Sequence, residues 1–190
     1  GAVPQAAPGV PPVFIQIDES PGTIAAMNND QDHETTCTGE IYIDGVMYAM
    51  PQMKGRGNSS WMMARTKKPY NVTLDGKVNL LGIDCDKTKK WSLLANCDEP
   101  SLLRDQLGYD MAHAMGVGLD SAQADVWMNG KYLGIYLITP KYDSFVPKNG
   151  FLIENDNYKE DPVENGGDPS FDLEGLIYSS RPPACDSQRL

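Results

Sequence analysis

Alternation of apolar and polar positions predicts that the first part of this chain forms β-strands. Residues 13–18, VFIQID, alternate with a period of two, which is typical of a strand with one buried face. In residues 40–48, EIYIDGVMY, the pair Asp44-Gly45 separates two runs rich in strand-forming residues. Such a pair adopts the positive φ angles of a type I′ turn, so this stretch predicts a β-hairpin.

Three further stretches extend the strand pattern. Residues 67–77, KKPYNVTLDGK, predict a strand that ends in an Asp-Gly turn, and residues 89–96, KKWSLLAN, predict another strand. Residues 124–138, ADVWMNGKYLGIYLI, contain Asn129-Gly130 between two β-rich arms. This dipeptide is the strongest short-range hairpin signal that a sequence carries, so we expect a second hairpin here.

Residues 101–115, SLLRDQLGYDMAHAM, give the one clear helical pattern. Ser101 lies near the expected N-cap, and Gly116 stands where a glycine commonly ends a helix. Apolar residues recur at helical spacing, which predicts one apolar stripe. We interpret the stripe as part of the hydrophobic core; its members are Leu103, Leu107, Met111, Ala114 and Met115.

After Pro140 the pattern weakens, apart from residues 150–156, GFLIEND, and residues 155–167 are typical of a surface loop. The order of elements predicts an α+β domain, mostly antiparallel sheet with one main helix. We expect three parts along the chain: a Pro/Ala/Gly-rich extended arm at 1–11, the folded domain at 12–156 and a loop-rich extension at 157–190.

Composition and charge narrow the class of protein. The 190 residues are 41% hydrophobic and 22% charged, as in ordinary globular proteins. The formal net charge is −10, which argues against nucleic acid as a general partner because binding to its backbone needs clustered cations. No apolar run approaches the roughly 18–20 residues of a membrane-spanning helix, so we expect no membrane span.

The four cysteines, Cys37, Cys85, Cys97 and Cys185, are widely spaced and include no C-x-x-C pair. An even count at such spacing favours two disulfides in a secreted protein, with three possible connectivities. We favour Cys85–Cys97 together with Cys37–Cys185. The alternative is a set of buried free thiols in a cytosolic protein.

The stretch KGRGNSSW, residues 54–61, supports two competing interpretations. Its glycines and cations are suited to holding a phosphate group, because glycine lets backbone N–H groups approach closely. The same stretch contains Asn58-Ser59-Ser60, a signal for N-linked glycosylation, and Asn71-Val72-Thr73 is a second such signal. A glycan on Asn58 would compete with a phosphate for the same space.

Several segments resemble the spore-coat protein H (CotH) kinase-like family. They are PPVFIQID, MKGRGNSSW, KKPYNVTLDGKVNLLGI, KKWSLLANCDEPSLLRDQLGYDMAHAMGV and VWMNGKYLGIYLITPKYD, in that order. The resemblance runs from about residue 12 to about residue 156. It implies a secreted domain that resembles the small, sheet-rich lobe of an atypical protein kinase, which in its complete form transfers phosphate from Mg²⁺-ATP to serine.

The resemblance also implies roles for particular residues. The glycine loop would lie near the nucleotide phosphates, Lys68 would neutralise phosphate charge, and the Asn129-Gly130 hairpin would lead into the hinge between lobes. The candidate nucleotide-binding residues are therefore Lys54, Gly55, Arg56, Gly57, Asn58, Ser59 and Lys68.

Two features depart from the family pattern. Pro140 stands where the family usually has an acid, in a TPK rather than a TEK-like stretch, so a contact from that side chain to a nucleotide would be lost. No pair of catalytic and metal-binding aspartates can be aligned, so we assign no catalytic or metal-binding residue. The acids available late in the chain, Asp156, Asp161, Asp168 and Asp172, are interpreted as solvated loop residues.

Two hypotheses follow. The first is an extracellular kinase-like domain that depends on Mg²⁺ and ATP in its complete form but is not catalytically competent as this 190-residue chain. The second is a non-catalytic, glycosylated extracellular module, such as a scaffold, adhesin or filament subunit. In the second hypothesis the partners are proteins, or further copies of the chain that assemble through the N-terminal arm.

Overall fold

The computed structural model describes residues 9–18, 23–63, 67–97 and 100–142, and the backbone of residues 152–155, 170–173 and 176–181. The chain divides into two compact units, Gly1–Lys141 and Tyr142–Leu190. We describe each unit by itself. The predicted boundary near residue 156 remains a prediction.

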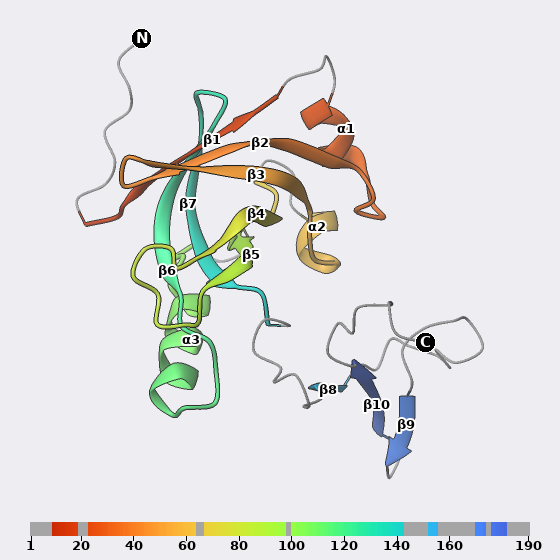
Figure 1. Cartoon of the computed structure of the whole chain (residues 1–190). Coiled ribbons are helices and arrows are strands. Elements are labelled where there is room, and N and C mark those ends of the chain that lie inside the picture. The colour runs from red at the N-terminus through yellow and green to blue at the C-terminus, as the bar shows by residue number, and fades with distance from the viewer. Residues whose placement is uncertain are drawn as a thin grey trace, which may run out of the picture. The chain divides into compact units, whose positions relative to one another are not determined.

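The first unit is built around a closed barrel of seven strands in the order β1-β2-β3-β4-β5-β7-β6 (Figure 1). Each strand pairs with neighbours on both sides. The strands are β1 (Pro12–Ile17), β2 (Thr36–Ile43), β3 (Val46–Gly55), β4 (Tyr70–Val78), β5 (Thr88–Leu94), β6 (Ala122–Met128) and β7 (Lys131–Pro140).

Pairing between the first and sixth strands closes this barrel. β1 runs parallel to β6, with Phe14 opposite Trp127, whereas the other strand pairs of the ring are antiparallel. Closure satisfies the backbone donors and acceptors that an open sheet would leave at its edges. The seven strands therefore form a ring rather than an open layer.

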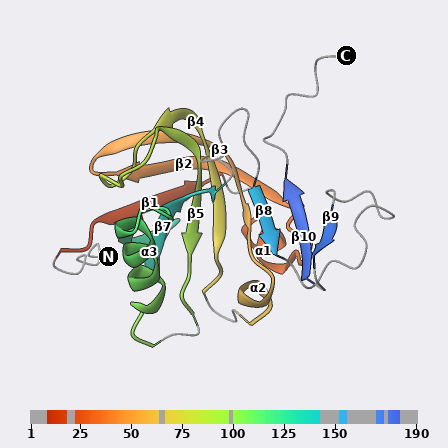
Figure 2. The same ribbon diagram turned by 90° about the horizontal axis from the view of Figure 1, so that it is seen from below.

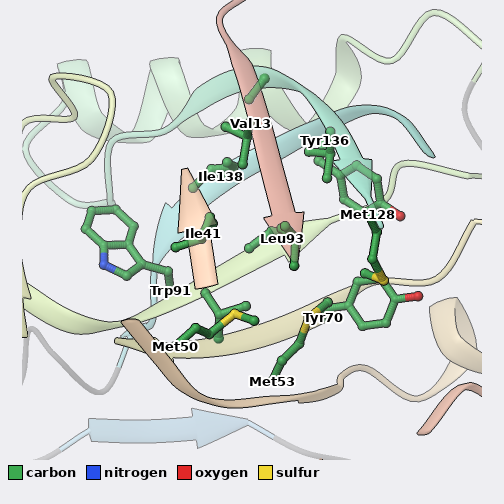
Figure 3. Packing of buried hydrophobic residues seen from close by; sticks show 14 of the residues in the cluster. Val13, Ile41, Met50, Met53, Tyr70, Trp91, Leu93, Met128, Tyr136 and Ile138 are labelled. Carbon is green, nitrogen blue, oxygen red and sulfur yellow. The ribbon is translucent and has the colours of Figure 1, made fainter. Parts of the chain in front are cut away.

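The inside of the barrel is filled by apolar side chains (Figure 3). Val13, Ile15 and Ile17 are at most 2% exposed, whereas the residues between them point outward. Trp91 and Tyr136, both fully buried, add large rings to the same core. Side chains fill small barrels in this way, so the interior serves as a core rather than as a ligand channel.

Both predicted hairpins are confirmed. Asp44 and Gly45 have φ angles of 50° and 75° between β2 and β3, and Asn129 and Gly130 have φ angles of 46° and 75° between β6 and β7. Positive φ at both central positions is the type I′ requirement. The predicted Asp75-Gly76 turn is wrong: both residues lie within β4, beside an irregularity in its pairing with β5.

The predicted helix is present but shorter, and its apolar stripe is not core. It forms α3 (Arg104–Ala114), with Leu103 rather than Ser101 as the N-cap. Gly116, at φ 71°, ends it as expected, because its N–H donates to the His113 carbonyl and the Val117 N–H donates to the Ala112 carbonyl. The helix contains no buried residue, and it lies outside the ring of strands (Figure 1, Figure 2).

The predicted fold class is wrong in its architecture. In place of a kinase-like small lobe with one main helix, the described residues form a closed mixed barrel with three short helices: α1 (Thr23–Asn29), α2 (Ser59–Met63) and α3. The mostly sheet-like character was predicted correctly. Closure was missed because it depends on pairing Pro12 with Asp125, and a local sequence pattern carries no information about contacts at that separation.

The second unit contains a three-stranded antiparallel sheet in the order β8-β10-β9. Its strands are β8 (Leu152–Asn155), β9 (Ser170–Leu173) and β10 (Leu176–Arg181). Two of these strands lie in the stretch for which the sequence predicts mainly loops. Throughout the part of the chain that the structure describes, we find no helix with the length and apolarity to span a membrane.

Candidate functional site

The glycine loop connects β3 to α2. Lys54 and Gly55 end β3, where they pair with Asn71 and Tyr70 of β4. The chain then turns at Gly57, which has a φ of 84°. The Asn58 carbonyl accepts hydrogen bonds from the N–H groups of Trp61 and Met62 in α2, so the loop passes directly into a helix of five residues.

Close packing explains the glycine at position 55. A Cβ atom placed on Gly55 would lie 2.6 Å from the Trp61 ring and 2.7 Å from Nδ1 of His33. Trp61 is 2% exposed, and His33 packs edge-on against it with ring centroids 4.8 Å apart. The first glycine is therefore required by contact with the aromatic layer beneath the loop.

A histidine also fixes the second glycine. Nε2 of His33 lies 2.6 Å from the Gly57 carbonyl oxygen. A carbonyl oxygen accepts hydrogen bonds, so this contact requires the proton of a neutral His33 to be on Nε2. His33 is thus a packing residue that positions the loop, and the two glycines are positioned by one imidazole.

The two lysines after the loop also contact the protein itself. Nζ of Lys68 donates to the Trp61 carbonyl at 2.9 Å and lies 4.3 Å above the indole ring. Nζ of Lys67 donates to the Ile135 carbonyl, and burial lowers the pKa of Lys67. The structure therefore gives Lys68 a contact that stabilises the loop, and its role in neutralising phosphate remains a prediction.

A pocket of about 320 Å³ lies beside the glycine loop. Two arginines contribute to its wall: Arg56 from the loop and Arg104 from the first turn of α3. The pocket is lined by Arg56, Ser60, Pro69, Leu94, Ala95, Asn96, Cys97, Arg104 and Asp105. It joins the loop to the end of β5 and the start of α3, two neighbouring segments that are distant in sequence from the loop.

The charges around this pocket suit an anion. Its lining carries two guanidinium groups against one carboxylate, that of Asp105. The charge of Arg56 also acts on Tyr109: burial raises the pKa of this phenol, the Arg56 charge opposes the rise and the Asp105 charge adds to it. Arginine presents a planar fork of donors that matches phosphate oxygens, so this pocket is the candidate phosphate site.

The predicted nucleotide-binding residues are only partly brought together. Arg56 lines the pocket, whereas Lys68 faces the Trp61 carbonyl. Sequence reasoning missed Asn96, Arg104 and Asp105, because they follow β5 or start α3 and belong to no loop motif. The one signal for Arg104 and Asp105 was the helix start itself, since a first helical turn brings backbone N–H groups to a site.

The two glycosylation candidates differ in their surroundings. Asn58 is exposed on the loop, whereas Asn71 lies within β4 and its side-chain oxygen accepts a hydrogen bond from Ser92 at 2.8 Å. An exposed asparagine on a loop is the more accessible acceptor for a glycan. Both sites remain predictions.

The structure does not support the predicted disulfides. Cys37 and Cys85 are free thiols, so neither Cys37–Cys185 nor Cys85–Cys97 is formed; Cys185 itself lies outside the described residues. Cys37 is buried inside β2, and burial raises the pKa of its thiol. An even count of cysteines suggested pairing, but count and spacing do not determine which side chains meet.

Metal ligands are sparse in the parts of the chain that the structure describes, where no cluster of three or more His, Cys, Asp or Glu side chains occurs. Asp156, Asp161 and Asp168 lie outside those parts, and Asp172 falls in β9. Mg²⁺ is usually held by one or two carboxylates together with substrate phosphates. Asp105 is the carboxylate that lines the arginine pocket.

Together, the fold and the pocket define an acidic, barrel-containing domain with an arginine-lined pocket beside a glycine loop. The family model described as "CotH kinase protein" matches residues 53–174. The match covers more than half of the chain, and the chain belongs to this family. No curated protein matches the chain.

Proposed function

We propose that this chain is a secreted CotH-type kinase-like domain whose arginine pocket binds the phosphate groups of a nucleotide. The single observation that carries this proposal is the placement of Arg56 and Arg104 on one pocket beside the glycine loop. Family membership supports a nucleotide as the source of the phosphates. The glycosylation signal at Asn71, a residue that does not line the pocket, supports secretion.

The chain's own residues would act by binding and orienting. Arg56 would contact phosphate oxygens through its forked donors, and Ser60 would add a hydroxyl from the first turn of α2. Asp105 would hold Mg²⁺, which when bound with ATP neutralises charge on the phosphates. The filled barrel interior excludes the base from the core, so the nucleotide would extend outward from the pocket.

We also propose that the chain binds without transferring phosphate. Pro140 supports this, because it is buried at the end of β7, opposite Trp91 of β5, in the place where the family resemblance implies an acid. A proline ring carries neither charge nor an N–H donor. A phosphate-binding domain without transfer activity fits both the pocket and this substitution.

Calorimetric titration tests the pocket directly. ATP, ADP and pyrophosphate are titrated into the chain with and without Mg²⁺, and Arg56→Ala is compared with Arg56→Lys. We expect Arg56→Ala to weaken binding about tenfold or more, since a hydrogen bond to a charged group contributes roughly 1.5–3 kcal/mol. Arg56→Lys should retain part of the affinity because it keeps the charge.

Lys89→Ala is the matched control, because it removes one exposed cation away from the pocket and should leave the affinity unchanged. Absence of binding by the wild-type chain would overturn the proposal. Equal losses in Arg56→Ala and Lys89→Ala would also overturn it, since they would show a general charge effect rather than a site.

A second candidate function is a glycosylated, non-catalytic extracellular module. The exposure of Asn58 favours it, because a glycan there would stand beside Ser60 at the rim of the pocket. Mass spectrometry of the tryptic peptide 57–65, with and without glycosidase, separates the two functions. Near-complete glycosylation would favour the structural module, and an unmodified Asn58 would favour nucleotide binding.

A further inference from the structure

Apolar side chains form one row across the outer face of the barrel. Strand pairing places Met47 opposite Tyr42, Tyr42 opposite Phe14, Phe14 opposite Trp127, and Trp127 opposite Tyr132. We call these five residues the aromatic row. It crosses five neighbouring strands, from β3 through β2, β1 and β6 to β7.

The row is packed in its centre and open at its flanks. Trp127 is 2% exposed, between Phe14 at 5.1 Å and Tyr132 at 4.8 Å (distances between ring centroids). Phe14, Tyr42, Met47 and Tyr132 are 36–49% exposed. Large apolar side chains that are exposed together on one face are typical of a surface that contacts a partner.

One flank of the row forms a hollow of about 380 Å³. Pro12, Phe14, Tyr42, Asp44 and Gly45 line it, so its walls are two aromatic rings and a proline ring, with a single carboxylate. The start of β1 and the β2–β3 turn meet at this end of the barrel (Figure 1). Grooves walled by aromatic rings bind proline-rich segments in the polyproline II conformation, whose shape is set before binding.

The chain contains a segment with this chemistry. Residues 1–8, GAVPQAAP, contain two prolines and no charged side chain. In polyproline II conformation eight residues span about 25 Å, at about 3.1 Å each. The segment joins the barrel beside the hollow, because Pro12 is itself part of the lining.

The short connection between arm and barrel favours a neighbour's arm over the chain's own. The Pro11 carbonyl accepts a hydrogen bond from the Asp125 N–H at 3.0 Å, which fixes the chain up to that point. Only Val10 and Gly9 lie between this anchor and the arm. Short hinges favour the exchange of a segment between two copies, because a return within one chain needs a tight reversal.

We propose that the hollow beside the aromatic row binds the proline-rich arm, residues 1–8, of a second copy of this chain, so that two copies exchange arms. Such an exchange produces a symmetric dimer in which each copy gives one arm and receives one. The arm adds no charged side chain to an interface between two copies of net charge −10. No residue lines both the hollow and the arginine pocket, so the proposal is independent of the nucleotide pocket.

Sedimentation equilibrium of the full chain over a range of concentrations is the test. We expect a mass of twice 20.8 kDa, reduced to that of the monomer by deleting residues 1–8 or by Tyr42→Ser. Met111→Ser is the matched control, since Met111 is also exposed but lies on α3, and it should leave the dimer intact. Added salt should strengthen the dimer by screening the repulsion between acidic copies.

A synthetic peptide of residues 1–10 gives a second measurement that does not depend on a substituted barrel. It should bind the deletion variant, and Pro4→Ala with Pro8→Ala in the peptide should weaken that binding. A wild-type chain that is monomeric at all concentrations overturns the exchange, even if the peptide binds, because the arm would then dock on its own barrel. A dimer that survives deletion of residues 1–8 overturns it as well.

Discussion

Two regions of this molecule carry regular apolar patterns, and only one of them is buried. Along β1, every second side chain faces the core and is at most 2% exposed. Along α3, the apolar side chains recur at helical spacing but stay 55–66% exposed; they are Leu103, Leu107, Met111 and Met115. The spacing of apolar residues determines which side chains share a face, and the rest of the fold determines whether that face is covered.

The difference arises from how each element is held. β1 pairs with β2 on one side and β6 on the other, so each inward side chain meets a ring of apolar neighbours. Polar contacts attach α3 instead: Gln106 donates to Ser121 at 3.3 Å, and His113 lies 3.3 Å from Asp84. These contacts fix the position of the helix without covering its apolar stripe.

The largest expected effect tests the buried side of this comparison. Ile41→Ala should lower the free energy of unfolding by about 2–5 kcal/mol, because Ile41 is fully buried and its truncation leaves a cavity in the barrel. Leu107→Ala is the matched control on α3, where the side chain is 60% exposed, and it should change stability by less than about 0.5 kcal/mol. Urea denaturation followed by circular dichroism measures both. Similar losses for the two variants would mean that a partner covers the stripe in solution.

Two glycines in the barrel strands differ in the same way: atoms crowd the position of a Cβ at Gly55, and none lies near it at Gly76. Gly55→Ala should cost about 1–3 kcal/mol, because the added methyl group would lie within 3 Å of both Trp61 and His33. Gly76→Ala, in β4, meets no atom within 4 Å and should be neutral or slightly stabilising. Thermal unfolding of both variants gives the measurement. A neutral Gly55→Ala would show that the loop does not pack on the aromatic layer.

Local elements were predictable from the sequence because their causes are local. The two type I′ hairpins depend on dipeptides, Asp44-Gly45 and Asn129-Gly130, and the end of α3 depends on Gly116. Barrel closure was not predictable, since it needs the pairing of Phe14 with Trp127 across more than half of the chain. The exposed stripe was unpredictable for the same reason, because burial is set by elements distant in sequence.

The sequence predicted the part of the candidate site that belongs to the glycine loop. The glycine loop identified Arg56, and this residue lines the pocket, whereas its contact with a nucleotide remains a prediction. Arg104 and Asp105 were not predicted, because α3 approaches the loop through the fold alone. Lys68 was assigned to a phosphate by resemblance, whereas its contact with the Trp61 carbonyl depends on the turn geometry of α2.

The smallest expected effects lie in α3 and just after its C-terminal end, and they have opposite signs. Gly116→Ala should lower stability by about 1 kcal/mol. The backbone at this position is left-handed, with a φ of 71°, and in that conformation a Cβ atom crowds the following carbonyl oxygen. Gly108→Ala should raise stability by up to about 1 kcal/mol, since alanine favours the helix and the added methyl group meets no atom within 4 Å. Because both variants add one methyl group at exposed positions of the same segment, the pair isolates backbone conformation from packing. Denaturation midpoints that shift in the same direction would contradict the capping geometry at Gly116, and with it the boundary at which the apolar stripe ends.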